Sequence, residues 1–167
     1  MRLSTKARYS VMAMAELARM QVTTQEPVTL ATLSERQNLP LAYLEQLFLK
    51  LRRKGLVKSV RGFGGDYTLA KTAASIPIFE IINAVDTPLK ATRCPINSHQ
   101  GCQSHGARCL THDLWSGLGK VVQTFLTNLS LEDVFLGNSL LPEVGMDFSK
   151  TNLASLKSNV TLTSLSA

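Results

Sequence analysis

The chain has 167 residues, a length that suits one compact domain or a small domain with an appendage. Hydrophobic residues make up 44% of it, which is enough for a core and excludes a disordered chain, and no apolar run approaches the roughly 20 residues of a membrane span. Lys6, Arg8 and Glu16 interrupt any apolar secretory signal. We therefore expect a cytoplasmic protein without a membrane partner, and in the cytoplasm thiols stay reduced.

The formal net charge of +6 is concentrated in the first part of the chain. Residues 1–71 hold 12 Lys and Arg against 5 Asp and Glu, a balance of +7, whereas residues 72–167 hold 6 against 7, a balance of −1. A basic part joined to a neutral part favours a polyanion-binding module with a separate partner. The alternative is a basic surface that is merely solvated.

Three helices are predicted in the basic part. Residues 4–20 form the first, because Ser4 can cap it and alanine and methionine favour helices. Residues 29–37 form a short second helix, and a turn at 38–40 leads into a third over 41–54, with Pro40 suited to its first turn. Gly55 ends the third helix. The residues expected to face the core from that helix are Leu44, Leu47, Phe48 and Leu51.

A two-stranded ribbon is predicted next. The strand-like stretches LVKSV and DYTLA flank the glycine-rich residues 61–65, which have the composition of a hairpin turn. Three helices followed by such a ribbon is the order of a winged helix-turn-helix. The expected fold class is therefore mainly α with a small β-hairpin wing, in which the third helix enters a DNA major groove.

The residue types along this module agree with DNA binding. Three polar residues lie off the apolar face of the third helix: Tyr43, Glu45 and Gln46. A glutamine can pair with adenine, and a glutamate can accept from cytosine. Basic side chains without an acidic neighbour follow and can neutralise phosphates, although cations also suit a helix C-terminus. These basic residues are Lys50, Arg52, Arg53, Lys54, Lys58 and Arg61.

A long amphipathic helix is predicted after a short one at 76–87. Over 113–136 the apolar residues recur at intervals of 3, 4, 3 and 4, as in a coiled-coil seam, and Leu114 and Val121 widen the stripe. So broad a stripe favours a symmetric homodimer, which presents two recognition helices to a pseudo-palindromic operator in double-stranded DNA. The alternative is a helix packed within one chain. The seam residues are Trp115, Leu118, Val122, Phe125 and Leu129.

The expected organisation has four parts. Residues 1–85 form the winged helix-turn-helix domain, 86–112 a segment with the cysteines, and 113–137 the dimerisation helix. Residues 138–167 are polar, with eight Ser or Thr over 149–167, and are expected to be disordered.

All three cysteines and all three histidines fall within residues 94–112. A redox switch between two thiols leaves His112 without a role. A structural zinc site accepts three cysteines and a histidine, but only Cys109 and His112 have tight spacing. An iron–sulfur cluster is larger and tolerates ligands spread over a glycine-containing segment. The cluster is favoured over zinc, and both stay open on spacing alone. Besides Cys109 and His112, the cysteines and histidines of this segment are Cys94, His99, Cys102 and His105.

Five stretches of residues 1–138 have a familiar sequence: MRLSTKARYSVMAM, LSERQNLPLAYLEQLF, LRRKGLVKSVRGFGGDYTLA, EIINAVD and ATRC…CLTHDLW. In these stretches the chain resembles the winged-helix transcription regulators of the IscR and NsrR group. Regulators similar to IscR bind a 2Fe–2S cluster through three cysteines and one histidine, which implies Cys94, Cys102, Cys109 and His112 here. The intervals between cysteines look longer than is usual, and His99 and His105 lie inside them. The wing reads GFGGDY where a proline and a third glycine are common.

The resemblance implies a regulator that senses cluster supply and adjusts transcription of cluster-assembly genes. The alternatives are a zinc-stabilised or thiol-sensing repressor, a nitric-oxide-sensing relative, or an iron–sulfur electron-transfer enzyme. An enzyme is disfavoured because the sequence has no catalytic triad, P-loop or dinucleotide-binding fingerprint. We expect no small-molecule substrate, and the sequence specifies neither the operator nor the sign of regulation.

Overall fold

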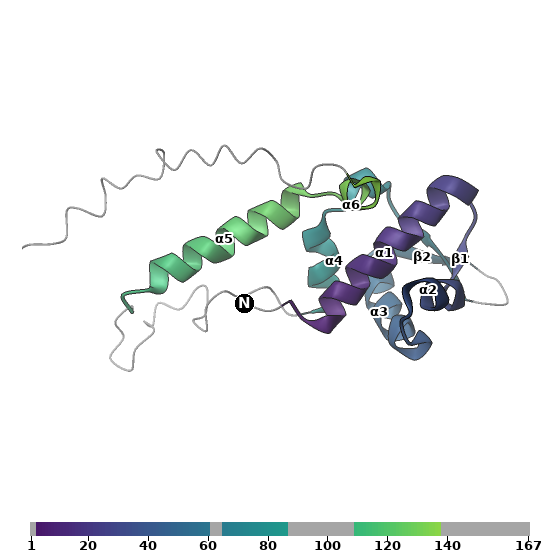
Figure 1. Ribbon diagram of the computed structural model, residues 1–167, viewed down its shortest axis with the longest axis horizontal. Helices are drawn as coiled ribbons and strands as arrows, with labels where there is room; N and C mark the ends of the chain where they lie inside the picture. Colours follow the sequence, from purple (N-terminus) through teal and green to yellow (C-terminus); the bar gives the residue numbers. More distant parts are fainter. Residues whose placement is uncertain (1–2, 61–64, 87–108, 138–167) are drawn as a thin grey trace, which may run out of the picture.

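The structure is a computed structural model that describes residues 3–60, 65–86 and 109–137. Helices α1 to α4 and α6 and a small sheet form a compact body, and α5 projects from it (Figure 1). No helix within the described ranges is both long and apolar enough to cross a membrane. The elements in chain order are α1 (Thr5–Thr24), β1 (Val28–Thr29), α2 (Leu30–Gln37), α3 (Leu41–Arg53), β2 (Val57–Val60), β3 (Asp66–Leu69), the 3₁₀ helix η1 (Ala73–Ser75), α4 (Ile78–Val85), α5 (His112–Asn128) and α6 (Leu131–Leu136).

Helix α1 is the centre of the body. Ser4 caps it as predicted, since its hydroxyl accepts from the backbone N–H of Ala7 at 3.1 Å. The helix runs four residues beyond the predicted end and stops where Gln25 adopts a left-handed conformation with φ 56°. Met14 and Leu17 are fully buried at its middle, and α2, α3, α4 and α6 pack around it.

The predicted helix-turn-helix is present. Thr29 caps α2 by accepting from the backbone N–H of Thr32 at 3.0 Å, and Asn38 ends it in a left-handed conformation with φ 51°. Pro40 occupies the N-cap position of α3 and not its first turn. The four residues expected to face the core from α3, Leu44, Leu47, Phe48 and Leu51, are all buried.

The wing is an antiparallel hairpin of β2 and β3, in which Val57 pairs with Leu69 and Val60 with Asp66. The hairpin tip, residues 61–64, lies outside the described residues. A third strand that the sequence did not predict, β1, pairs with the free edge of β3, so the sheet order is β1-β3-β2. The added strand anchors the wing to the segment between α1 and α2.

The prediction of one helix over 113–136 is wrong. Helix α5 ends at Asn128, Leu129 is extended, and Ser130 begins α6 with a reciprocal capping box to Asp133. Two backbone hydrogen bonds hold this junction to the start of α4, from Ile78 N–H to the Leu129 carbonyl at 2.9 Å and from Leu131 N–H to the Ile76 carbonyl at 2.8 Å. Leu131 is fully buried. Helix α6 therefore packs on α1 and does not extend the projecting helix.

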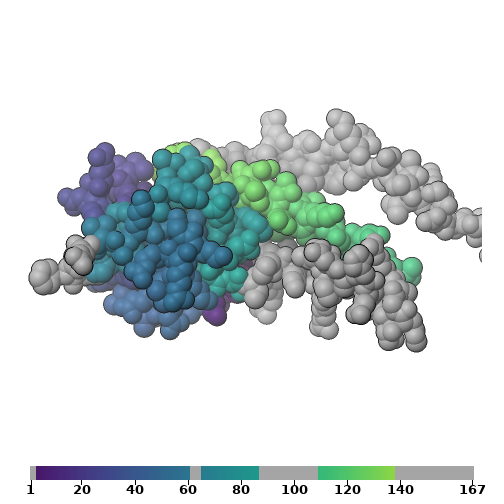
Figure 2. All heavy atoms as spheres, turned by 180° about the vertical axis from the view of Figure 1, so that it is seen from behind, coloured from purple at the N-terminus to yellow at the C-terminus, as the bar shows by residue number. Residues whose placement is uncertain are grey.

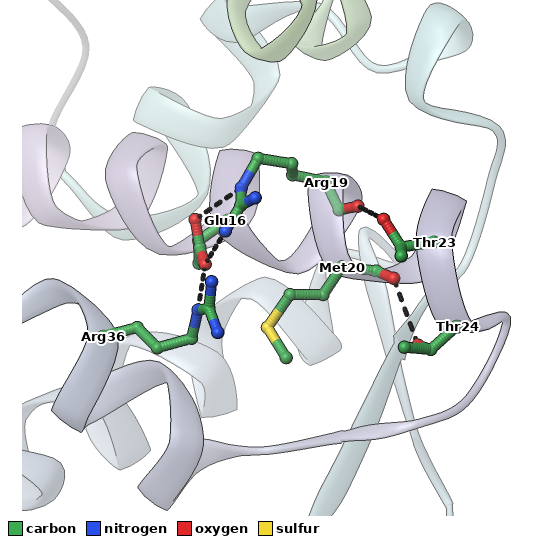
Figure 3. Close-up of polar contacts among 6 residues, drawn as sticks. All are labelled: Glu16, Arg19, Met20, Thr23, Thr24 and Arg36. Carbon is green, nitrogen blue, oxygen red and sulfur yellow. Dashed lines mark hydrogen bonds and ion pairs between the residues drawn. The ribbon is translucent and has the colours of Figure 1, made fainter.

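An ion cluster joins α1 to α2 (Figure 3). Arg19 binds the buried Glu16 carboxylate through two hydrogen bonds, of 2.6 and 3.1 Å, and Arg36 of α2 reaches the same carboxylate at 2.5 Å. The bonds from Arg19 lower the pKa of Glu16 below its ordinary value, against the opposing effect of burial, and raise the pKa of Arg19. Glu16 thereby fixes α2, the first helix of the helix-turn-helix, on α1.

Candidate DNA-binding surface and cluster-binding site

The outer face of α3 is exposed. Glu45 and Gln46 both lie on this face, on the side of α3 away from its buried leucines, as the sequence predicted. A glutamine amide can form a bidentate pair with adenine, and a carboxylate can accept from the amino group of cytosine. The fold thus leaves free the two polar side chains suited to reading base edges.

Exposed cations follow at the end of α3 and along β2. Arg52, Arg53, Lys54 and Lys58 are exposed there. Figure 2 shows the face of the molecule to which this part of the chain, coloured blue for its place in the sequence, contributes. The Arg52 guanidinium donates to the Ser59 hydroxyl at 3.3 Å, which connects the end of α3 to the wing. Arg61 lies outside the described residues. The helix end and the first wing strand therefore form one cationic edge, suited to phosphates.

Besides Arg52, two further predicted DNA-binding residues have partners inside the protein. Tyr43 is partly buried and stacks edge-on against Tyr9 of α1, with ring centroids 5.8 Å apart. The Lys50 ammonium donates to the Val85 carbonyl at 3.1 Å. Val85 is the last residue of α4, where a cation is favoured. Lys50 thus ties α3 to the end of α4, a role that the sequence did not suggest because the two residues are 35 positions apart.

Helix α5 has no buried residue and presents an apolar stripe to solvent. Two residues of the predicted seam are partly covered within the single chain, because Val122 is partly buried and Leu129 packs on the core. The exposed stripe has the helical spacing of 4, 3 and 4, and Trp115 adjoins it with 44% of its surface exposed. The stripe consists of Leu114, Leu118, Val121 and Phe125.

The described part of the predicted ligand set lies at the start of α5. A tight turn brings Cys109 and His112 together, since the His112 N–H donates to the Cys109 carbonyl at 3.0 Å. Cys109 is a half-buried free thiol. Cys94 and Cys102 lie outside the described residues, as do His99 and His105. Within the ranges that the structure describes, no three potential ligands gather at one point.

One more polar group adjoins this turn. The Thr111 hydroxyl lies 3.8 Å from the Cys109 sulfur, the longer distance that sulfur allows for a hydrogen bond. Thr111 occupies the N-cap position of α5, yet its side chain makes no cap hydrogen bond. Thr111 was not among the predicted site residues, and its place between a cysteine and a histidine in CLTHDLW was the signal available in the sequence.

Three helices around a buried leucine-rich face, an antiparallel wing and a cationic edge define a winged helix-turn-helix protein of the DNA-binding class. The chain belongs to the Rrf2 family, described as iron-dependent transcriptional regulators, whose model matches residues 3–136. The predicted fold class and family are therefore confirmed. The protein is a transcriptional regulator and not an enzyme.

Similar proteins support the same assignment. The HTH-type transcriptional regulator IscR of Photorhabdus laumondii is 49% identical over 146 residues, which cover 87% of this chain and 85% of that protein. IscR of Xenorhabdus nematophila is 49% identical over 142 residues, or 84% of this chain and 83% of that protein. Among solved structures, T. potens IscR is 34% identical, with a TM-score of 0.63 over 82% of this chain and 88% of that one. CymR, the global cysteine regulator of B. subtilis, is 29% identical, with a TM-score of 0.67 over 83% of this chain and 99% of that one.

Proposed function

We propose that the protein is a homodimeric regulator that senses iron–sulfur cluster status and controls genes of cluster assembly. The turn that joins Cys109 to His112 at the start of α5 carries this proposal, because a backbone hydrogen bond links a residue with a thiol to one with an imidazole in a chain related to IscR proteins. The proposed location is the cytoplasm, where a reduced thiol set can receive a cluster.

The proposed cofactor is a 2Fe–2S cluster held by Cys94, Cys102, Cys109 and His112. Thiolate and imidazole are ligands that this cluster accepts together. Cys109 and His112 fit the group, because a thiolate and an imidazole are donors that it accepts and only two residues separate them at the start of α5. When bound, the cluster supplies a one-electron redox centre of about −1 net charge in its oxidised state with three thiolates and a neutral histidine.

The proposed organisation keeps residues 1–85 as the DNA-binding domain, 86–112 as the cluster-binding segment and 113–137 as the dimerising part, with α6 packed back on the first domain. In sequence, the segment joins the end of α4 to the start of α5. The Lys50 ammonium bound to the Val85 carbonyl connects that end of α4 to α3. The cluster-binding segment is thereby connected to the recognition helix α3 through α4 and to the dimer helix α5 directly. Binding of the cluster can therefore shift the population between two arrangements of these helices.

The proposed DNA partner is a pseudo-palindromic operator. Glu45 and Gln46 contact base edges, and Arg52, Arg53 and Lys54, with Lys58 and Arg61 of the wing, contact phosphates. Tyr43 and Lys50 act from behind this surface, because both are half-buried and held by partners inside the protein. Two copies of α3 in a dimer satisfy the symmetry of such a site.

The choice of histidine tests this proposal. We expect His112→Ala to lose or markedly alter the visible spectrum of the cluster, because only two residues separate His112 from Cys109 and a backbone hydrogen bond closes the turn between them. The matched variants His99→Ala and His105→Ala are expected to keep the wild-type spectrum. A wild-type spectrum in His112→Ala, with loss in His105→Ala, would overturn the ligand set. A zinc-stabilised module would lack the visible spectrum in every variant, including the parent.

A further inference from the structure

Thr111 departs from the other helix starts of this chain. Within the described residues, four α-helices begin after Ser or Thr, and in α1, α2 and α6 the hydroxyl accepts from the backbone N–H three residues on. Thr111, at the start of α5, makes no such bond, with φ −98° and ψ 6°. Its hydroxyl lies instead 3.8 Å from the Cys109 sulfur. The side chain is thus directed away from the role that its position favours.

The direction of this hydrogen bond follows from the chemistry of the sulfur. In a free thiol either atom can donate. A cysteine that binds a metal has lost its proton, so its sulfur can only accept. With Cys109 ligating, the Thr111 hydroxyl is the donor of the pair. Hydrogen bonds to a thiolate sulfur stabilise negative charge there, and the charge on a cluster grows more negative on reduction.

We propose that Thr111 is a positioning residue for the cluster, whose hydroxyl donates to the Cys109 sulfur and raises the reduction potential. This inference rests on the proposed function, since it takes Cys109 as a ligand. The hydroxyl makes no bond to the cluster metal. It acts through the sulfur, and its position is held by the turn whose His112 N–H bonds to the Cys109 carbonyl at 3.0 Å.

The test is a redox titration of anaerobically purified, cluster-loaded protein, followed by visible absorption. Thr111→Val removes the hydroxyl at nearly constant shape, and because Thr111 makes no cap bond the variant loses no helix cap. Thr111→Ser restores the donor. Thr124→Val, at an exposed threonine farther along the same helix, controls for the loss of any hydroxyl from α5.

We expect Thr111→Val to lower the reduced-to-oxidised ratio at a fixed ambient potential about tenfold, a shift of about 59 mV to lower potential for a one-electron couple. Thr111→Ser and Thr124→Val are expected to titrate as the wild type does. Loss of the cluster from Thr111→Val, with retention in Thr111→Ser, would equally support a role of the Thr111 hydroxyl at the cluster. Resonance Raman spectra are expected to shift an iron–cysteine stretching band in Thr111→Val alone.

Two results would overturn the inference. A wild-type potential in Thr111→Val would show that the hydroxyl does not act on the cluster, and an equal shift in Thr111→Val and Thr111→Ser would assign the effect to something other than the donor. Both leave the proposed function standing. Wild-type protein that binds zinc and holds no sulfide would instead remove the proposed function, and this inference with it.

Discussion

Replacing Leu118 by alanine is expected to weaken a homodimer formed through α5. Leu118 lies in the middle of the exposed stripe, and 42% of its surface stays exposed in the single chain. Burying a whole leucine side chain contributes about 1.5–3 kcal/mol. The exposed share therefore corresponds to about 0.6–1.3 kcal/mol per chain.

A two-fold symmetric interface buries the same residue twice. Leu118→Ala should then cost the dimer about 1.3–2.5 kcal/mol, which raises the dissociation constant about 10- to 60-fold. Alanine is a strong helix former, so α5 itself should stay intact. Any cavity left in the interface adds to the loss.

Sedimentation equilibrium over a range of protein concentrations measures this change. Gln123→Ala is the matched control, because Gln123 is exposed on the same helix, off the stripe. We expect Gln123→Ala to dissociate as the wild type does. A wild-type dissociation constant for Leu118→Ala, or a wild-type protein that stays monomeric at every concentration, would refute the assignment of the stripe to a dimer interface.

Three further predictions concern DNA binding and the stability of the fold. Arg53→Ala should weaken binding to all DNA sequences alike and lower by about one the slope of log binding constant against log salt concentration. Gln46→Ala should instead change the preference among sequences by about 1–3 kcal/mol. A uniform loss of affinity in both variants would refute these roles. Because the pKa of Glu16 is lowered, its stabilisation is complete above the ordinary value of 4.5 and is lost as pH falls through the folded-state pKa. Glu16→Gln should therefore cost about 1 kcal/mol at pH 7 in urea unfolding and flatten the loss of stability as the pH falls below 4.5. An unchanged pH profile would contradict this. Ser130→Ala should cost about 1 kcal/mol by removing the α6 cap, and calorimetry showing an unchanged melting temperature would contradict it.

The recognition helix was predictable because its determinants are local. Leucine spacing identified the buried positions of α3, and Gly55 its end. The caps at Ser4 and Thr29 were equally predictable from sequence, because each hydroxyl accepts from a backbone N–H only three residues further along the chain.

The break between α5 and α6 was missed because two local signals compete there. The apolar spacing continues past Asn128, yet Ser130 and Asp133 form a capping box. Backbone bonds between Leu129, Leu131 and the start of α4 favour the cap, and such long-range bonds leave no trace in periodicity.

Strand β1 and the partner of Lys50 were missed for a related reason. A two-residue strand exists only because the edge of β3 lies beside it. Lys50 is one of several cations in its stretch of sequence, and only the packing of α4 on α3 brings the Val85 carbonyl to it. The Glu16 cluster likewise joins residues 20 positions apart.

The central claim is that the three cysteines and one histidine hold an iron–sulfur cluster. Iron, zinc and acid-labile sulfide measured on the same anaerobically purified protein test it most directly. We expect about two iron atoms and two sulfide ions per chain, with little zinc. One zinc ion per chain and no sulfide would contradict it.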